Sequence, residues 1–107
     1  MPMSKQSVKD ASTRRVEQAL SEHYLPNHPQ ARIGAYRYNS ASIRVRIIDP
    51  DFEGKSIVTR EAEVLPIVRD LPDRLQDQIT MLLLITPEES ERSLLSAEFD
   101  DPKRSRL

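Results

Sequence analysis

"DFEGKSIVTREAE", residues 51–63, separates two kinds of sequence pattern. Alternating apolar residues end just before it, and apolar residues at helical spacing begin just after it. Gly54, one of only two glycines in the chain, is expected to adopt a positive φ angle in a tight turn. Phe52 is expected to anchor this turn in the core, and Ser56 is expected to cap the helix that follows. The stretch therefore predicts a strand, a turn and a helix in succession.

A β-hairpin is predicted before the turn, with strands at residues 31–39 and 40–49 joined by a short polar connection. The second strand alternates apolar residues with arginines, so one face should be buried and the other should lie in water. The apolar residues are Ile43, Val45 and Ile47, and the arginines are Arg44 and Arg46.

Helical spacing occurs in two regions before the last strand. Residues 12–25 predict a first helix, with Ser12 or Thr13 as its cap. After Ser56, the expected apolar side of a helix consists of Ile57, Val58, Val64, Leu65 and Val68. Pro66 interrupts this spacing, which predicts two short helices or a kink there. Pro72 is expected to begin a further helical turn.

The last elements are a third strand at residues 78–86 and a final helix. The strand is apolar on both faces, which is typical of a strand covered on both sides. Thr86 and Glu89 form a capping-box pattern around Pro87, and Leu94 and Leu95 are the expected buried side of the final helix.

The resulting order is helix, strand, strand, helix, helix, strand, helix. It predicts an α/β protein of the α+β two-layer type, a three-stranded mixed sheet with helices on one face. The helical crossover makes the third strand parallel to its neighbour. We expect one domain over residues 12–98, a disordered segment at 1–11 and a disordered tail at 99–107.

Composition excludes several classes of function. The net charge of -1 gives no overall attraction to nucleic acid or anionic membranes, and the longest apolar run is too short to span a bilayer. The chain has no cysteine, so thiolate metal sites and disulfides are excluded, and we expect a soluble, cytoplasmic protein. No nucleophile–base pair, phosphate loop or metal-ligand spacing is visible, so we expect neither an enzyme nor a resident metal or cofactor.

The element order, with "FEGKSIVTR" after the second strand and "ITPEE" after the third, resembles the BolA-like family, whose fold is a variant of the type II KH topology. The resemblance runs from about Val16 to Glu89. It is strongest at Phe52, Glu53, Gly54, Lys55, Ser56, Val58 and Arg60.

This resemblance implies partnership with monothiol glutaredoxins in holding a [2Fe–2S] cluster, and in some family members DNA binding in regulation of stress and cell shape. This sequence departs from the family pattern at the positions that ligate the cluster. Glu61 and Ala62 stand where the family has a histidine and a basic residue, and the strand-start histidine is replaced by Gln78 or Thr80. The hairpin loop also lacks a histidine or cysteine, so the chain resembles a divergent member that does not itself ligate a cluster.

Two surfaces are candidates for contact with a partner. Arginines and a lysine could contact phosphates, or could be salt-bridged to nearby acids on a wet sheet face; they are Arg37, Arg44, Arg46, Lys55 and Arg60. A KH-type GxxG loop is absent, which disfavours sequence-specific nucleic-acid binding. Leu82 and Leu84 share a face of the third strand and could contact a protein partner.

The resulting interpretation is a BolA-related protein-interaction or regulatory module, acting as a monomer or weak homodimer. The alternatives are a nucleic-acid-binding regulator and a divergent partner of glutaredoxin in iron–sulfur assembly.

Overall fold

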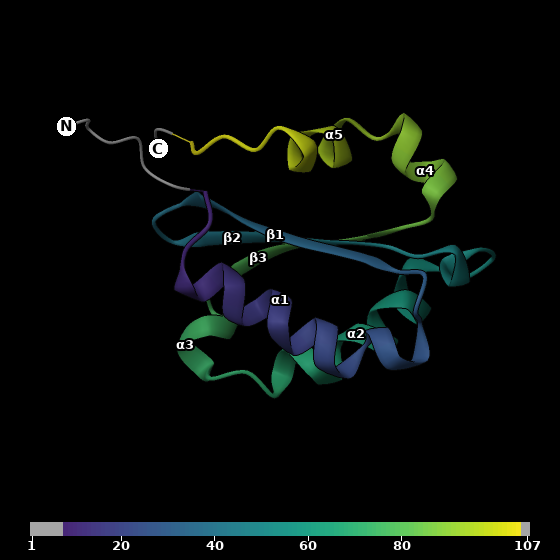
Figure 1. The fold of residues 1–107 in the computed structure, drawn as a ribbon, viewed down its shortest axis with the longest axis horizontal. Coiled ribbons are helices and arrows are strands. Elements are labelled where there is room, and N and C mark those ends of the chain that lie inside the picture. The colour runs from purple at the N-terminus through teal and green to yellow at the C-terminus, as the bar shows by residue number, and fades with distance from the viewer. Residues whose placement is uncertain (1–7, 106–107) are drawn as a thin grey trace.

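The computed structural model describes residues 8–105 and arranges them around a three-stranded sheet (Figure 1). The strands are β1 (Arg32–Asn39), β2 (Ser42–Ile48) and β3 (Ile79–Ile85). The α-helices are α1 (Ala11–His23), α2 (Ile57–Arg69), α3 (Asp73–Gln76), α4 (Pro87–Arg92) and α5 (Leu94–Asp100), and two 3₁₀ helices are η1 (Leu25–Asn27) and η2 (Pro50–Phe52).

The sheet is mixed, as the sequence predicted, with the order β1-β2-β3. β1 pairs antiparallel with β2, and β2 pairs parallel with β3. The polar hairpin connection sets the first pairing, and the crossover through α2 and α3 sets the second. β2 is thus the central strand, and β1 and β3 are the edge strands of the described sheet. The outer edge of β1 is partly covered, because Ala35 donates to Glu17 and Arg37 donates to Val8 through their backbone N–H groups.

One face of the sheet carries α1, α2 and α3 and holds the hydrophobic core (Figure 1). The apolar face of β2 lies here as predicted, because every second side chain of a strand points the same way. Its residues Ile43, Val45 and Ile47 are fully buried. α1 adds Val16, Ala19 and Leu20 to this core, and α2 adds Val64 and Val68.

The opposite face of the sheet is covered by α5, so the prediction of helices on one face only is wrong (Figure 1). Arg44 and Arg46, predicted to lie in water, are also largely buried. Arg46 donates to the carbonyl oxygen of Ser96 at 2.7 Å and pairs with Asp100 at 3.0 Å. Arginine has a long apolar stem and five donors, so it can line a covered face when acceptors are supplied.

The final helix is also divided differently from the prediction. Thr86 and Glu89 form the predicted capping box at the start of α4, but α4 ends at Arg92 and Ser93 caps α5. Leu94 and Leu95 lie in α5, and Leu94 is 85% exposed, so their predicted burial is wrong. α5 instead turns Ser96 and the ring of Phe99 toward the arginine-bearing face, where Phe99 meets Tyr36 edge-on at 5.0 Å.

Asp10, not Ser12 or Thr13, caps α1. Its carboxylate accepts from the backbone N–H of Thr13, and the Thr13 hydroxyl accepts from the backbone N–H of Asp10. The same carboxylate pairs with Arg37 at 2.9 Å. Burial acts to raise the pKa of Asp10, but these hydrogen bonds and the Arg37 charge outweigh burial and lower it.

α2 is one continuous helix across Pro66, so of the two predicted alternatives the division into two helices is wrong, and a kink stays a prediction. The pyrrolidine ring removes a single intrahelical donor, and the remaining helix is held by its buried residues Val64 and Val68. Pro72 does precede a further helical turn, α3, as predicted.

Residues near both ends of the described chain contact the sheet or belong to a helix. Within the predicted N-terminal disordered segment, Val8 accepts a backbone hydrogen bond from Arg37 at 2.7 Å. Within the predicted tail, Phe99 and Asp100 belong to α5, and Ser105 donates to Tyr38 at 2.6 Å. The expectations for residues 1–7 and 106–107 lie outside the described residues. Across residues 8–105, no helix is both long and apolar enough to cross a membrane.

The two competing caps of α1 allow a direct test. Asp10→Ala removes the cap of α1 and the partner of Arg37, and should lower the free energy of unfolding by about 1–2 kcal/mol. Ser12→Ala, at the cap position that the sequence suggested, should change it by less than about 0.5 kcal/mol. Urea denaturation followed by circular dichroism measures both, and equal losses would contradict the cap assignment.

Candidate protein-interaction groove

The turn between β2 and α2 has the structure that its sequence predicts. Asp49 ends β2 and caps η2 by accepting from the backbone N–H of Asp51. Phe52 is fully buried, Gly54 has a φ of 76°, and Ser56 caps α2 by accepting from the backbone N–H of Thr59. These three residues are therefore structural parts of the turn that fix where α2 begins.

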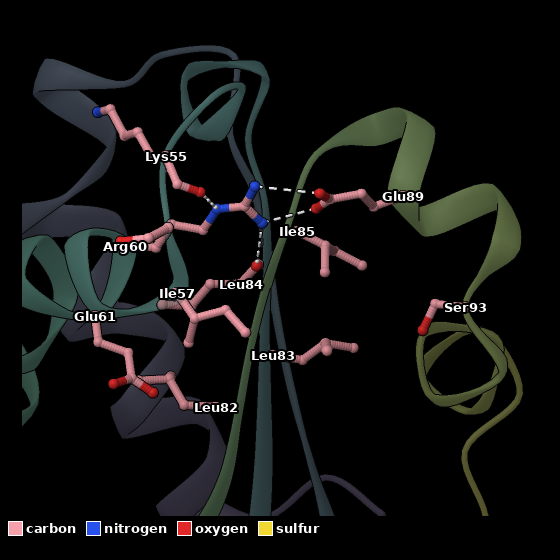
Figure 2. A pocket seen from close by; sticks show the side chains of 11 residues that line it. Lys55, Ile57, Arg60, Glu61, Leu82, Leu83, Leu84, Ile85, Glu89 and Ser93 are labelled. Carbon is pink, nitrogen blue, oxygen red and sulfur yellow. Dashed lines mark hydrogen bonds and ion pairs between the residues drawn. The ribbon is translucent and has the colours of Figure 1, made fainter.

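Arg60 joins this turn to β3 and α4 (Figure 2). Its side chain is 8% exposed and donates to the Lys55 carbonyl at 3.0 Å and the Leu84 carbonyl at 2.9 Å. It also forms a bidentate pair with Glu89, at 2.7 and 3.2 Å. A planar guanidinium matches a carboxylate in this way, so Arg60 holds three elements in one arrangement.

The same pairing perturbs the ionisation of Glu89. Hydrogen bonds from Arg60, followed by the backbone N–H of Thr86, lower the pKa of Glu89 from 4.5 to about 2. Burial opposes this shift but is outweighed. Glu89 therefore stays charged wherever the fold is intact at ordinary pH, and serves both the α4 cap and Arg60.

Two hollows follow the free edge of β3 beside α2. The first has a volume of about 470 Å³ and lies beside the Arg60 pairing (Figure 2). The second has a volume of about 340 Å³ and lies toward the start of β3. Glu61 and Leu82 line both hollows, so the two are adjacent and form one groove.

Backbone groups of β3 face this groove. The Leu84 carbonyl points away from β2, because it accepts from Arg60 of α2. Backbone groups two residues apart in a strand point to the same side, so the N–H and C=O of Leu82 and the N–H of Leu84 face the free edge as well. Arg60 closes the edge at Leu84 and leaves it open beside Leu82.

The groove carries one negative side chain without a partner. Glu61 lies midway along it and has no hydrogen bond or ion pair to any residue in the 8–105 range. The other charges around the first hollow are neutralised, since Lys55 pairs with Glu63 at 2.7 Å and Arg60 pairs with Glu89. The groove centre at Glu61 is thus locally acidic, whereas Arg69, which lines the second hollow and has no ion pair within residues 8–105, is a positive charge toward the start of β3.

The predicted contact residues Leu82 and Leu84 face inward. Leu84 belongs to the buried core, and Leu82 is partly buried and packs against it. These two side chains do not form an exposed strip, because β2 places Val45 and Ile47 beside them on the helix-covered face. What β3 leaves open is its backbone edge, and the use of this strand for a protein contact stays a prediction.

Exposed apolar side chains beside the groove were missed by the sequence reasoning. Ile57 and Val58, in the first turn of α2, are 69% and 75% exposed. Ile57 lines the first hollow. Helical spacing assigned both residues to the buried side, but α2 places its core positions at Arg60, Val64 and Val68 instead. The spacing of those three at intervals of four was the available signal.

The basic residues proposed for phosphate contact do not form a free positive surface. Each pairs with a carboxylate of this chain, and Arg44 also stacks on Tyr38 at 3.5 Å. The pairs are Arg37 with Asp10, Arg44 with Glu98, Arg46 with Asp100, Lys55 with Glu63, and Arg60 with Glu89. Four of the five thus belong to the packing of α4, α5 or the α1 cap, and contact with nucleic acid stays a prediction.

These features define an α+β protein with a mixed three-stranded sheet whose third strand borders an open groove. No protein-family model and no curated protein matches the sequence. Among solved structures, the chain is similar to a crystal structure described as a bol-like protein from Babesia bovis. The identity is 20% and the TM-score 0.45, over 85% of this chain and 96% of that chain. An identity and a TM-score this low do not establish a family, so membership in the BolA-like family is a proposal.

The Arg60–Glu89 pair predicts a dependence of stability on pH. A carboxylate whose pKa is lower in the folded state stabilises the fold above its unfolded pKa of 4.5, and this stabilisation is lost as the pH falls through about 2. Because Glu89 is 40% exposed, we expect Glu89→Gln to cost only about 1–2 kcal/mol at pH 7. The difference from the unmodified protein should shrink steadily between pH 5 and pH 2.

Glu88→Gln is the matched control, since Glu88 is exposed and lies one residue away in the same helical turn. It should change stability by less than about 0.5 kcal/mol at either pH. Urea denaturation across this pH range measures both variants, and a pH-independent loss for Glu89→Gln would contradict the role of its charge.

Proposed function

We propose that this chain is a BolA-like, non-catalytic protein that acts by binding a partner protein. The observation that carries the proposal is the open edge of β3, with exposed backbone groups beside an apolar groove. Edge strands of this kind bind extended segments by adding a strand to the sheet. The family assignment is supported by the turn sequence from Phe52 to Arg60 and by the order of the elements.

The partner segment is expected to be an extended chain that alternates apolar residues with a basic residue at its centre. Alternation follows from strand geometry, since only every second side chain of an added strand would face the hollows. A central lysine or arginine would meet Glu61, the unpaired charge that borders both hollows. Ile57, which lines the first hollow, supplies exposed apolar surface at one end of the groove.

A second copy of this chain fits the groove less well than a partner segment with a central basic residue. Two copies joined edge to edge along β3 would bring their groove centres together, and each centre carries Glu61. Like charges at an interface oppose association. At the groove centre, charge complementarity thus favours a basic residue of a partner over the Glu61 of a second copy.

No observation favours nucleic-acid binding, or a role in iron–sulfur assembly, over the binding of a partner protein at β3. A monothiol glutaredoxin, which the resemblance suggests, is one protein whose binding could be tested at the same edge, and the absence of cysteine leaves the cluster ligands to the partner. For nucleic acid, the five candidate basic residues already have carboxylate partners. A cytoplasmic location fits a chain without cysteine.

Binding can be tested with three peptides that differ at one position. Each is a nine-residue chain of alternating valine and threonine with lysine, glutamine or glutamate at its centre. The lysine peptide should bind about five- to tenfold more tightly than the glutamate peptide. It should also slow hydrogen exchange at the backbone amides of Leu82 and Leu84, which nuclear magnetic resonance measures residue by residue.

Reversal of one charge provides the decisive comparison. Glu61→Lys should invert the ranking, so that the glutamate peptide binds best, whereas Glu22→Lys on the exposed surface of α1 should leave the ranking unchanged. The proposal fails if none of the peptides binds, if the ranking does not depend on residue 61, or if protection appears away from β3.

A further inference from the structure

A compact group of polar side chains lies at the end of β2, on residues that the proposed groove does not use. His28 follows η1, Asp49 ends β2, and Asp51 lies in η2. Asp49 is held in place because one of its oxygens caps η2. The side chain of His28 is only 19% exposed and stacks on Tyr24 at 4.2 Å.

The three side chains place possible metal ligands close together. His28 Nδ1 lies 2.8 Å from Asp51 Oδ2 and 3.2 Å from Asp49 Oδ2, and all three ligand atoms lie within 4.8 Å of one another. Donors around a tetrahedral zinc ion, at about 2.0–2.1 Å from the metal, are separated by about 3.3 Å. Small side-chain movements would therefore let the three atoms share one ion.

Surrounding residues hold these ligands in the manner typical of metal sites. Tyr24 donates its hydroxyl to Asp49 Oδ2 at 2.6 Å, and burial followed by this hydrogen bond raises the pKa of Tyr24, so it remains a donor. On the far side of the imidazole, Glu63 Oε1 lies 3.9 Å from His28 Nε2. This oxygen is buried and has no hydrogen-bond partner among the described residues.

The unpartnered oxygen of Glu63 bears directly on the state of His28. A histidine that binds metal through one ring nitrogen usually donates its other N–H to a carboxylate. With Nδ1 on a metal, the proton would lie on Nε2 and face Glu63 Oε1. The charges around the site also fit a bound cation. Lys55 is paired with Glu63, so the negative charges of Asp49 and Asp51 face His28 rather than Lys55.

We propose that His28, Asp49 and Asp51 bind one divalent transition-metal ion of the zinc class. One imidazole nitrogen and two carboxylate oxygens suit such an ion better than Mg²⁺ or Ca²⁺, which prefer oxygen ligands alone. Asp51 is 54% exposed, so the ion can reach the site from solvent and a fourth position is open to water. The competing explanation is a protonated His28 that forms ion pairs with the same two carboxylates.

Calorimetric titration of the untagged full chain with Zn²⁺ at pH 7.5 tests the proposal. One equivalent should bind, Co²⁺ should give the absorption bands of a tetrahedral site, and both ions should raise the melting temperature. His28→Ala should weaken Zn²⁺ binding by at least about 100-fold, and Glu63→Gln should weaken it by about tenfold.

His23→Ala is the matched control, since His23 is exposed at the end of α1 and should leave the affinity unchanged. If His28→Ala does not fold, Asp51→Asn takes its place, because that side chain is largely exposed and holds only one contact of the site. The proposal is overturned if the chain binds no Zn²⁺ or Co²⁺ at about 100 µM, or if His23→Ala weakens binding as much as His28→Ala does.

Discussion

The arrangement of this fold depends on the hydrogen bonds made by the buried guanidinium group of Arg60. It joins the turn before α2, the end of β3 and the cap of α4 through hydrogen bonds to Lys55, Leu84 and Glu89. A charge at 8% exposure must be matched by acceptors, so the three elements can occupy only positions that supply them. Phe52 lies beneath the same guanidinium at 5.5 Å, which ties the turn to the core.

The Arg60 contact also explains which part of β3 is open. β3 is an edge strand in the described sheet, and unpaired edges bind other chains unless they are covered. Arg60 and Glu89 cover the edge at Leu84, whereas the edge beside Leu82 has only the groove next to it. The open segment is short, which limits uncontrolled strand addition and still leaves room for a specific partner segment.

Covering the second face of the sheet changes what the arginines do. Arg44 and Arg46 look like a wet, basic face in the sequence, yet α5 lies over them and supplies Glu98 and Asp100. α5 is short and keeps Leu94 and Leu95 exposed, so its attachment relies on these ion pairs and on Phe99 against Tyr36. The two arginines of β2 can therefore be largely buried, because carboxylates of α5 are placed to match them.

Sequence alone determined the elements whose signals are local. Alternation fixed the buried face of β2, the positive φ of Gly54 and the cap at Ser56 fixed the turn, and Thr86 with Glu89 fixed the start of α4. Such features depend on residues within a few positions of one another, which is what a pattern can report. The mixed topology followed as well, because a helical crossover constrains strand direction.

Only the tertiary structure decided the pairings between distant residues. Asp10 proved to be the cap of α1, α5 folded over Arg44 and Arg46, and Glu61 came to lie between two hollows along β3. His28 met Asp49 and Asp51 although residues 29–48 lie between His28 and Asp49 in the chain. No local spacing encodes such contacts, since they form only when the packing of separate elements has fixed which side chains face each other.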